Sequence, residues 1–227
     1  MKRTPTEEWL DSDAGTPEEI SGSLSDLWFI NRAFGGVSTA ESLIKRVANA
    51  NSLSKISLLE VASGPGKVPE AVMKRMRGDG IDLEISFLDK SRSHLNGSGR
   101  SVVGDAVELP FANDSFDIVS STLFMHHLMP DDARRFMSES LRVCRRAVLI
   151  NDVIRSPLHL ALVYAGLPLF RSRLTWHDAP ASVRQAYTLK EMEDLLAGSS
   201  ASRIETSWHY LYRMGVIAWK QRGDAHV

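Results

Sequence analysis

The pattern of apolar and polar positions is clearest between residues 56 and 76. Residues 56–61 form an aliphatic run that contains the acid Glu60, and a glycine-rich turn follows at once. A strand, a glycine turn and a helix in this order are typical of the opening unit of a nucleotide-binding α/β fold, where the turn and the helix start face the ligand. After the turn, apolar residues recur at the spacing of one buried helix face: Val68, Ala71, Val72 and Met76.

The same pattern predicts further elements on both sides of this unit. Capping boxes predict the starts of helices at Thr16 with Glu19, Ser38 with Glu41, and Thr188 with Glu191, and Pro130 with two acids predicts another. Strands are predicted at residues 83–88, 101–103, from 116 onward, 147–150, 203–208 and 212–219. The apolar residues 157–170 predict a buried or interfacial helix, and residues 171–178 predict a polar loop.

The spacing of the glycines separates two classes of ligand. A dinucleotide fingerprint needs G-x-G-x-x-G, but Gly64 and Gly66 are followed by residues 67–69 without a third glycine. What is present is acid-x-small-x-Gly-x-Gly, which begins at Glu60 and has Ala62 as the small residue. This run resembles the first motif of class I S-adenosylmethionine-dependent methyltransferases, in which the acid helps to hold the amino end of the cofactor. Most members have glycine where Ala62 stands.

Further segments follow in the order expected for that family. Asp89 comes close to the expected ~20 residues after the glycine turn, where an acid accepts hydrogen bonds from ribose hydroxyls. In the family, an aspartate in the place of Asp105 accepts from the adenine amino group, and the next amide, here that of Ala106, reads the ring. Residues 109–119 resemble the run into the fourth strand of small-molecule methyltransferases related to the ubiquinone and menaquinone biosynthetic enzymes, and residues 122–128 resemble their histidine-containing segment.

The resemblance implies a fold, a cofactor and a set of contacts. The fold would be α/β, a Rossmann-like sheet of seven mostly parallel strands with helices on both faces, an antiparallel last hairpin, and a helical lid at about residues 155–187. Residues 1–50 would be an N-terminal arm and helices that cover the cofactor cleft, and residues 51–227 the domain that binds S-adenosyl-L-methionine. The candidate cofactor contacts are Arg32, Glu60, Ala62, Ser63, Gly64, Gly66, Asp89, Lys90, Asp105, Ala106 and Thr122.

Three residues are candidates for the chemistry. Methyl transfer from a sulfonium needs an aligned nucleophile and the removal of one proton. His126 and His127 follow the fourth predicted strand and Asp152 ends the fifth, and carboxyl ends of parallel strands open on the ligand side. A histidine oriented by an aspartate could remove the proton. A structural or cofactor-supporting role for the histidines stays open, and His177 and Tyr187 are second candidates.

The apolar segment 157–170 bears on the acceptor. It is too short to span a bilayer, which needs about 20 apolar residues. In the resemblance this position holds a cover over the acceptor, which implies an apolar acceptor such as a quinone, phenol, polyketide or lipid-like molecule. A helix that only packs on the core or at a dimer contact is the alternative. The run Asn-Pro-Pro-Tyr does not follow the fourth strand, which favours oxygen or carbon over nitrogen as the methylated atom.

Composition narrows the class of protein. The chain has 227 residues, enough for one domain with a core that needs no disulfide, and its single cysteine, Cys144, indicates a reducing compartment. With 27 basic and 28 acidic side chains, nothing in the overall charge indicates nucleic-acid binding. Residues 1–16 lack the apolar centre of a signal peptide. We therefore expect a cytoplasmic monomer or homodimer that acts on a small molecule, with no metal ion and no membrane span.

Two other functions remain open on the sequence. A methyltransferase-like accessory protein could bind the cofactor without catalysis, although the intact acid and glycine positions disfavour it. A nicotinamide-dependent oxidoreductase is disfavoured by the missing third glycine.

Overall fold

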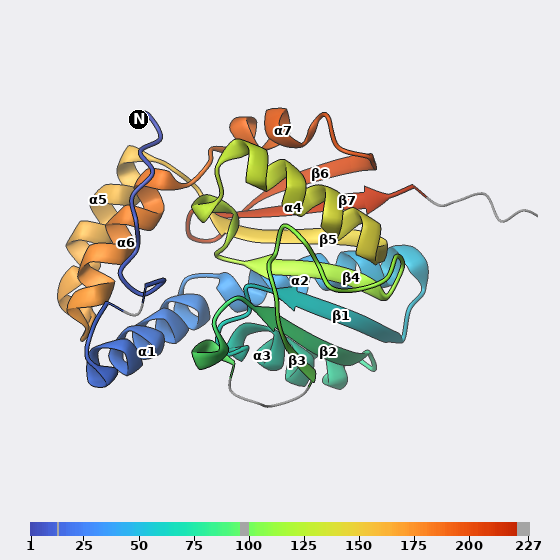
Figure 1. Ribbon diagram of the computed structural model, residues 1–227, viewed down its shortest axis with the longest axis horizontal. Coiled ribbons are helices and arrows are strands. Elements are labelled where there is room, and N and C mark those ends of the chain that lie inside the picture. The colour runs from blue at the N-terminus through green and yellow to red at the C-terminus, as the bar shows by residue number, and fades with distance from the viewer. Residues whose placement is uncertain (13, 96–99, 222–227) are drawn as a thin grey trace, which may run out of the picture.

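The computed structural model describes residues 1–12, 14–95 and 100–221 (Figure 1). Its centre is a seven-stranded sheet with the strand order β3-β2-β1-β4-β5-β7-β6. The first five strands in this order are parallel to their neighbours, and β7 is antiparallel to both β5 and β6. The strands are β1 Lys55–Val61, β2 Asp82–Asp89, β3 Arg100–Val103, β4 Phe116–Thr122, β5 Cys144–Val153, β6 Ala201–His209 and β7 Arg213–Lys220. The predicted fold class is confirmed.

Helices cover both faces of this sheet and group beyond one end of it (Figure 1). The α-helices are α1 Pro17–Ala33, α2 Gly36–Asn51, α3 Lys67–Gly78, α4 Pro130–Val143, α5 Pro157–Gly166, α6 Arg173–Gln185 and α7 Leu189–Leu196. Short 3₁₀ helices are η1 Arg92–His94, η2 Met125–His127 and η3 Leu167–Leu169.

Two of the three predicted capping boxes are present. The hydroxyl of Thr16 caps α1 and that of Thr188 caps α7, each with the glutamate three residues later. The cap predicted at Ser38 is wrong, because the N-cap of α2 lies three residues earlier. Gly35 holds the N-cap place with a left-handed backbone (φ +84°), and the Ser38 hydroxyl donates to the Gly35 carbonyl from inside the first turn.

The polar loop predicted at residues 171–178 is also wrong. Ser172 caps α6 by accepting a hydrogen bond from the amide of Leu174, and the helix runs on to Gln185 through Pro180. Serine is a common N-cap residue, so the sequence offered Ser172 as a helix start. A proline usually ends a helix, however, and Pro180 therefore obscured the helical pattern of α6. The helix predicted over residues 157–170 ends earlier, at Gly166.

The core has one cluster on each face of the sheet. One cluster packs α4 and α7 against the sheet, and the other packs α2 and α3 against the opposite face. In the second cluster Leu43, Ile44 and Val47 of α2 are buried with Leu58 of β1 and Ile217 of β7. Helix α2 therefore belongs to the sheet's own core, while the division at residue 50 stays a prediction.

A third group of helices lies beyond the sheet. Helices α1, α5 and α6 stand together on the left of Figure 1, and the N-terminal arm, residues 1–12, runs along them. Helix α1 packs on α6, and α5 packs on the other side of α6. This group faces the end of the sheet at which the segments that follow β1, β2 and β4 emerge, so it can close a ligand cavity there.

Substitution of Gly66 by alanine is expected to destabilise the turn after β1. Gly66 has φ +69°, and a Cβ there would lie 2.6 Å from Cε1 of Phe87. The left-handed backbone costs about 1–2 kcal/mol for a residue with a Cβ, and the clash roughly 1–3 kcal/mol more. Gly64→Ala is the matched control, because Gly64 also has positive φ (+50°) but open space around its Cβ. Urea unfolding measures both, and equal losses would show that the contact with Phe87 does not matter.

Candidate functional site

A cavity of about 800 Å³ opens where β1, β2 and β4 end. Its floor is the glycine turn and the residues that follow these strands, and its walls come from α1 and the N-terminal arm. Its size is within the usual range for small-molecule sites. Among the residues predicted from sequence, those that line it are Glu60, Ala62, Ser63, Gly64, Asp89, Lys90, Asp105, Ala106, Thr122, His126 and His127.

The glycine turn is tied to the end of β2. The carboxylate of Asp89 accepts from the amide of Gly64 (2.8 Å) with one oxygen and from the amide of Ser91 (2.9 Å) with the other. The amide of Ser63 donates to the carbonyl of Leu88 (3.1 Å). The carboxylate of Asp89 therefore fixes the bend of the glycine turn beside the cavity.

Ala62 is under conformational constraint at the start of this turn. Its φ is +53°, in the left-handed region that favours glycine. This is the physical reason why the related motif usually has glycine at this place. Alanine makes the bend at a cost of about 1–2 kcal/mol.

Glu60 places a buried carboxyl group at the wall of the cavity. It is 3% exposed, and the hydroxyl of Ser120 on the neighbouring strand β4 donates to its Oε2. Burial raises the pKa of Glu60 to about 7, with the hydrogen bonds of Ser120 and Thr122 opposing the rise. A carboxylate in such surroundings gains most from a cationic ligand group, which would compensate its buried charge.

Asp105 and Ala106 lie on the far side of the cavity from Glu60 along the sheet edge. Asp105 is exposed, and its Oδ1 accepts from the amide of Val107 (3.0 Å), which shapes the loop after β3. Ala106 is buried at the cavity wall. The arrangement leaves both residues beside the open space, as a ring-binding role requires.

Three of the predicted site residues do not line the cavity. Arg32 is exposed, because its neighbour Asn31 is the residue of α1 that turns inward. Gly66 faces Phe87 and serves the packing of the turn. Asp152 lies behind His126, which separates it from the cavity.

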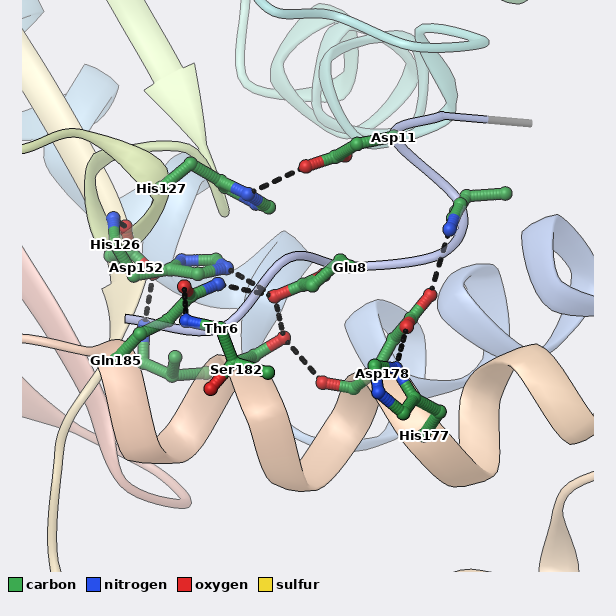
Figure 2. Close-up of polar contacts among 12 residues, drawn as sticks. Thr6, Glu8, Asp11, His126, His127, Asp152, His177, Asp178, Ser182 and Gln185 are labelled. Carbon is green, nitrogen blue, oxygen red and sulfur yellow. Dashed lines mark hydrogen bonds and ion pairs between the residues drawn. The ribbon is translucent and has the colours of Figure 1, made fainter. Parts of the chain in front are cut away.

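His126 is held between two carboxylates (Figure 2). Its Nδ1 lies 2.6 Å from Oδ1 of Asp152, and its backbone amide donates to Oδ2 of the same residue (3.0 Å). Its Nε2 lies 3.4 Å from Oε1 of Glu8, an ion pair. Burial alone would lower the pKa of His126, but Asp152 and Glu8 outweigh it and raise the pKa to about 10. The two carboxylates therefore favour the protonated form of the ring.

His127 faces the cavity beside it. Its Nδ1 lies 2.9 Å from Oδ2 of Asp11, and its ring centroid is 4.1 Å from that of His126. The fold therefore brings together the two histidines and the predicted Asp152, and adds Glu8 and Asp11.

Glu8 and Asp11 belong to the arm and were not predicted as site residues. Two side chains of α6 hold Glu8 Oε1: the hydroxyl of Ser182 (2.6 Å) and the amide of Gln185 (2.7 Å). Burial would raise the pKa of Glu8, but its contacts with His126 lower it below the ordinary value. No sequence motif marks an arm residue of this kind, because its partners lie far away in the chain.

The arm is fixed along its length. Arg3 donates to the carbonyls of His126 and Leu128 (both 2.9 Å), which ties the arm to the histidine segment. Further on, Asp178 of α6 accepts from the amides of Trp9 (2.9 Å) and Leu10 (3.0 Å). The arm is thus a wall of the cavity.

The second candidates from the sequence lie outside the cavity lining. His177 stacks on the ring of Trp9 with centroids 4.0 Å apart and contacts Asp178 through Nδ1 (2.8 Å). Tyr187 donates from its hydroxyl to the carbonyl of Leu128 (2.8 Å), and Arg3 lies over its ring. Both residues serve to anchor the arm and its surroundings.

Comparison with known proteins identifies the domain. Residues 59–150 match the model of a family described as a methyltransferase domain. Residues 59–150 therefore carry a methyltransferase domain. No curated protein sequence is similar enough to this methyltransferase to count as a match.

Solved structures share the fold of this methyltransferase. A methyltransferase from Aquifex aeolicus aligns with a TM-score of 0.56 and 16% identity over 78% of this chain and 89% of that one. A possible histamine N-methyltransferase from Thermotoga maritima aligns with a TM-score of 0.60 and 13% identity over 89% and 98%. Magnesium protoporphyrin IX methyltransferase from Synechocystis with bound S-adenosylhomocysteine gives 0.53 and 15% over 82% and 84%. At these identities the likeness shows the fold alone.

None of the helices in the described part of this methyltransferase has the length and apolar character of a membrane span.

Glu60 is expected to make cofactor binding dependent on pH. Because its pKa is raised to about 7, a lower pH protonates it and removes the charge that would pair with the ligand's ammonium group. Affinity for S-adenosylhomocysteine, measured by calorimetry, should fall roughly tenfold for each pH unit below about 7.

The control for this dependence is Glu60→Gln, which cannot titrate. It should bind roughly 10- to 100-fold more weakly at neutral pH, the equivalent of about 1.5–3 kcal/mol for a hydrogen bond to a charged group. Its affinity should not change between about pH 6 and 8. The same pH slope in the variant and the native protein would remove Glu60 from this role.

Proposed function

We propose that this methyltransferase acts on a small acceptor with an apolar or aromatic body and methylates it at oxygen or carbon. The proposed cofactor is S-adenosyl-L-methionine, which supplies an electrophilic methyl group on a sulfonium sulfur. The observation that carries the proposal is that one cavity holds both the acidic residues suited to the cofactor and an apolar wall beside a histidine pair. The subtype related to ubiquinone and menaquinone biosynthesis is part of the proposal.

The cofactor half of the cavity is built from the ends of β1, β2 and β3. Glu60 would hold the amino end, Asp89 the ribose hydroxyls and Asp105 with Ala106 the adenine. Their fit rests on the buried carboxylate of Glu60 and on the open space above Gly64, where nothing lies within 4 Å of a Cβ position. Ser63, Lys90 and Thr122 also line this half.

The acceptor half has apolar walls from other segments than expected. No residue of α5 lines the cavity, and Leu158, Leu162 and Leu169 of the apolar segment are exposed on the outside of the molecule. Among the apolar residues that line the cavity, those from the arm, from α1 and from the segment after β4 would form the acceptor half: Leu10, Leu24, Leu27, Trp28, Phe124 and Leu128. An apolar acceptor is therefore proposed from these walls, not from the helix that suggested it in the sequence.

The histidine segment would orient the reacting atom. His126 and His127 are the polar groups on the wall that Phe124 and Leu128 otherwise make apolar. Asp152 contacts both the ring and the backbone amide of His126. Asp152 would therefore act by positioning His126, and His126 would touch the ligand. An acceptor with one oxygen function on an apolar body would place that oxygen here.

The proposed activity is tested with methyl-labelled cofactor and a panel of acceptors. Phenols, hydroxyquinones and enolic compounds should become labelled, and small hydrophilic amines should not. Labelling of the amines in preference would contradict the proposal. Cofactor binding without transfer to any member of the panel would favour the accessory function.

Leu27→Asn is expected to lower kcat/KM for the acceptor without changing the affinity for the cofactor. Replacing a cavity-wall leucine by an amide removes apolar surface worth about 1.5–3 kcal/mol, so kcat/KM for the acceptor should fall roughly tenfold or more. Affinity for S-adenosylhomocysteine should stay within about twofold, since an apolar wall contributes little to a polar cofactor end.

Leu162→Asn is the matched control, because Leu162 is an exposed leucine of α5. Its kinetics should equal those of the native protein. A larger loss from Leu162→Asn than from Leu27→Asn would restore α5 as the cover of the acceptor.

A further inference from the structure

We propose that Glu8, His126 and His127 bind one divalent transition-metal ion at the acceptor end of the cavity. No metal ion was expected from the sequence, because no acidic cluster with ligand spacing stands out in it. Glu8 and the two histidines lie more than 100 residues apart in the chain. The arm brings them together (Figure 2). The site itself does not depend on the proposed function; only the use made of the ion does.

The distances suit a common ion. One ligand atom from each of the three residues lies within 4.8 Å of the others. Nε2 of His126 and Oε1 of Glu8 are 3.4 Å apart. Two ligands about 2.0–2.2 Å from a tetrahedral ion are separated by roughly 3.3–3.5 Å, so this pair already has the required spacing.

His126 offers an unused buried nitrogen. Its Nε2 is buried without a hydrogen-bond partner within the described residues, because its contact with Glu8 is an ion pair outside hydrogen-bond geometry. A buried polar atom left in this state needs an explanation. A metal ion bound by this nitrogen and by Oε1 of Glu8 would give the nitrogen the partner that it lacks.

Each histidine also has the outer partner that metal-binding histidines usually have. In such sites the second ring nitrogen contacts a carboxylate or carbonyl, which fixes the ring and raises its basicity. Nδ1 of His126 contacts Asp152 (2.6 Å), and Nδ1 of His127 contacts Asp11 (2.9 Å). Asp152 contacts the His126 backbone amide as well, so that ring is held at two points.

The third ligand is held equally firmly. Ser182 and Gln185 of α6 donate to Oε1 of Glu8, and Arg3 joins the arm to the carbonyl of His126. The ligands therefore come from segments that the same contacts fix relative to one another. A site of this kind loses little conformational freedom when an ion binds.

The ligand types select the ion and leave room for the acceptor. Two imidazoles and one carboxylate suit Zn²⁺, Fe²⁺ or Co²⁺ better than Mg²⁺ or Ca²⁺, which prefer oxygen ligands. Three protein ligands leave at least one position open. Since Glu8, His126 and His127 all line the cavity, that position faces it.

The open position would receive an acceptor oxygen, which deepens the proposed function. A phenol or enol bound there loses its proton to water and stays on the ion as an oxyanion. Its oxygen, or the conjugated carbon of the enolate, forms the new bond to the methyl group. The methyl–sulfur bond breaks, and its electron pair stays on sulfur. No side chain then has to act as the base.

The test is a titration of untagged protein with Co²⁺, followed by calorimetry and by the visible absorption of the bound ion. One equivalent should bind, with a spectrum typical of mixed nitrogen and oxygen ligands. His127→Gln and Glu8→Gln should each weaken binding at least tenfold. Glu7→Gln and His209→Gln are matched controls, since Glu7 is an exposed neighbour in the arm and His209 lies on β6, and both should bind like the native protein.

The outcomes separate the site from the activity. Absence of Co²⁺ binding, or equal binding in the native protein and both ligand variants, would overturn the proposal. His127 is partly exposed, so His127→Gln should keep the native unfolding midpoint even if Glu8→Gln loosens the arm. Binding of S-adenosylhomocysteine, measured separately, reports on the cofactor half. A protein that binds Co²⁺ at these ligands but methylates no acceptor would keep the metal site and reject the function.

Discussion

The cluster of Asp152, His126 and Glu8 is the interaction on which the ligand cavity depends. It joins three segments that are distant in the chain: the end of β5, the helix η2 and the N-terminal arm. Buried charges are tolerated only when they are paired, and removal of one partner typically costs about 3–5 kcal/mol. The arm therefore has a strong electrostatic reason to lie where it does, and closure of the cavity and arrangement of the histidines are one event.

A second buried polar network places α1 over the cavity. The guanidinium of Arg213 is 1% exposed and donates to the side chains of Asn31 (2.8 Å) and Asn151 (3.5 Å). Burial lowers the pKa of Arg213 to about 10, which still leaves it charged at neutral pH. Because successive residues of a helix point about 100° apart, the inward place of Asn31 turns Arg32 to solvent. The register of α1, set by this network, decides which residues meet a ligand.

The sheet and the cofactor half of the site could be predicted from the sequence because local patterns specify them. An aliphatic run predicts a strand, its end predicts the ligand edge, and Glu60, Gly64 and Asp89 follow at short spacing. Each of these residues lines the cavity, as the order of motifs indicated. Gly66 differs from these residues, because it does not line the cavity. Its place in the motif was recognised, but the contact that requires glycine there is with Phe87 of β2.

The proposed acceptor half could not be predicted because its parts are joined only by tertiary contacts. In the sequence, nothing distinguishes Glu8 from the other acids of the polar arm. Its role depends on contacts with Ser182 and Gln185 of α6, and Pro180 obscured the helical pattern of α6 in the sequence. The apolar composition of α5 misled for the same reason, since an apolar segment can face a neighbouring helix or solvent as well as a ligand.

This division follows from how the two halves are stabilised. The cofactor half is part of the sheet, so its residues share the core's constraints, and a change such as a larger side chain at Gly66 disturbs the strands themselves. The proposed acceptor half is joined by polar contacts between the arm, α6 and η2. Phe124, Met125 and Leu128 also pack on the first core cluster, but no residue of the arm belongs to either cluster among the described residues. Substitutions in the arm can therefore alter the acceptor surface while the sheet keeps its packing. The part of the chain with the least regular pattern is thus the part with most freedom to vary the proposed acceptor surface.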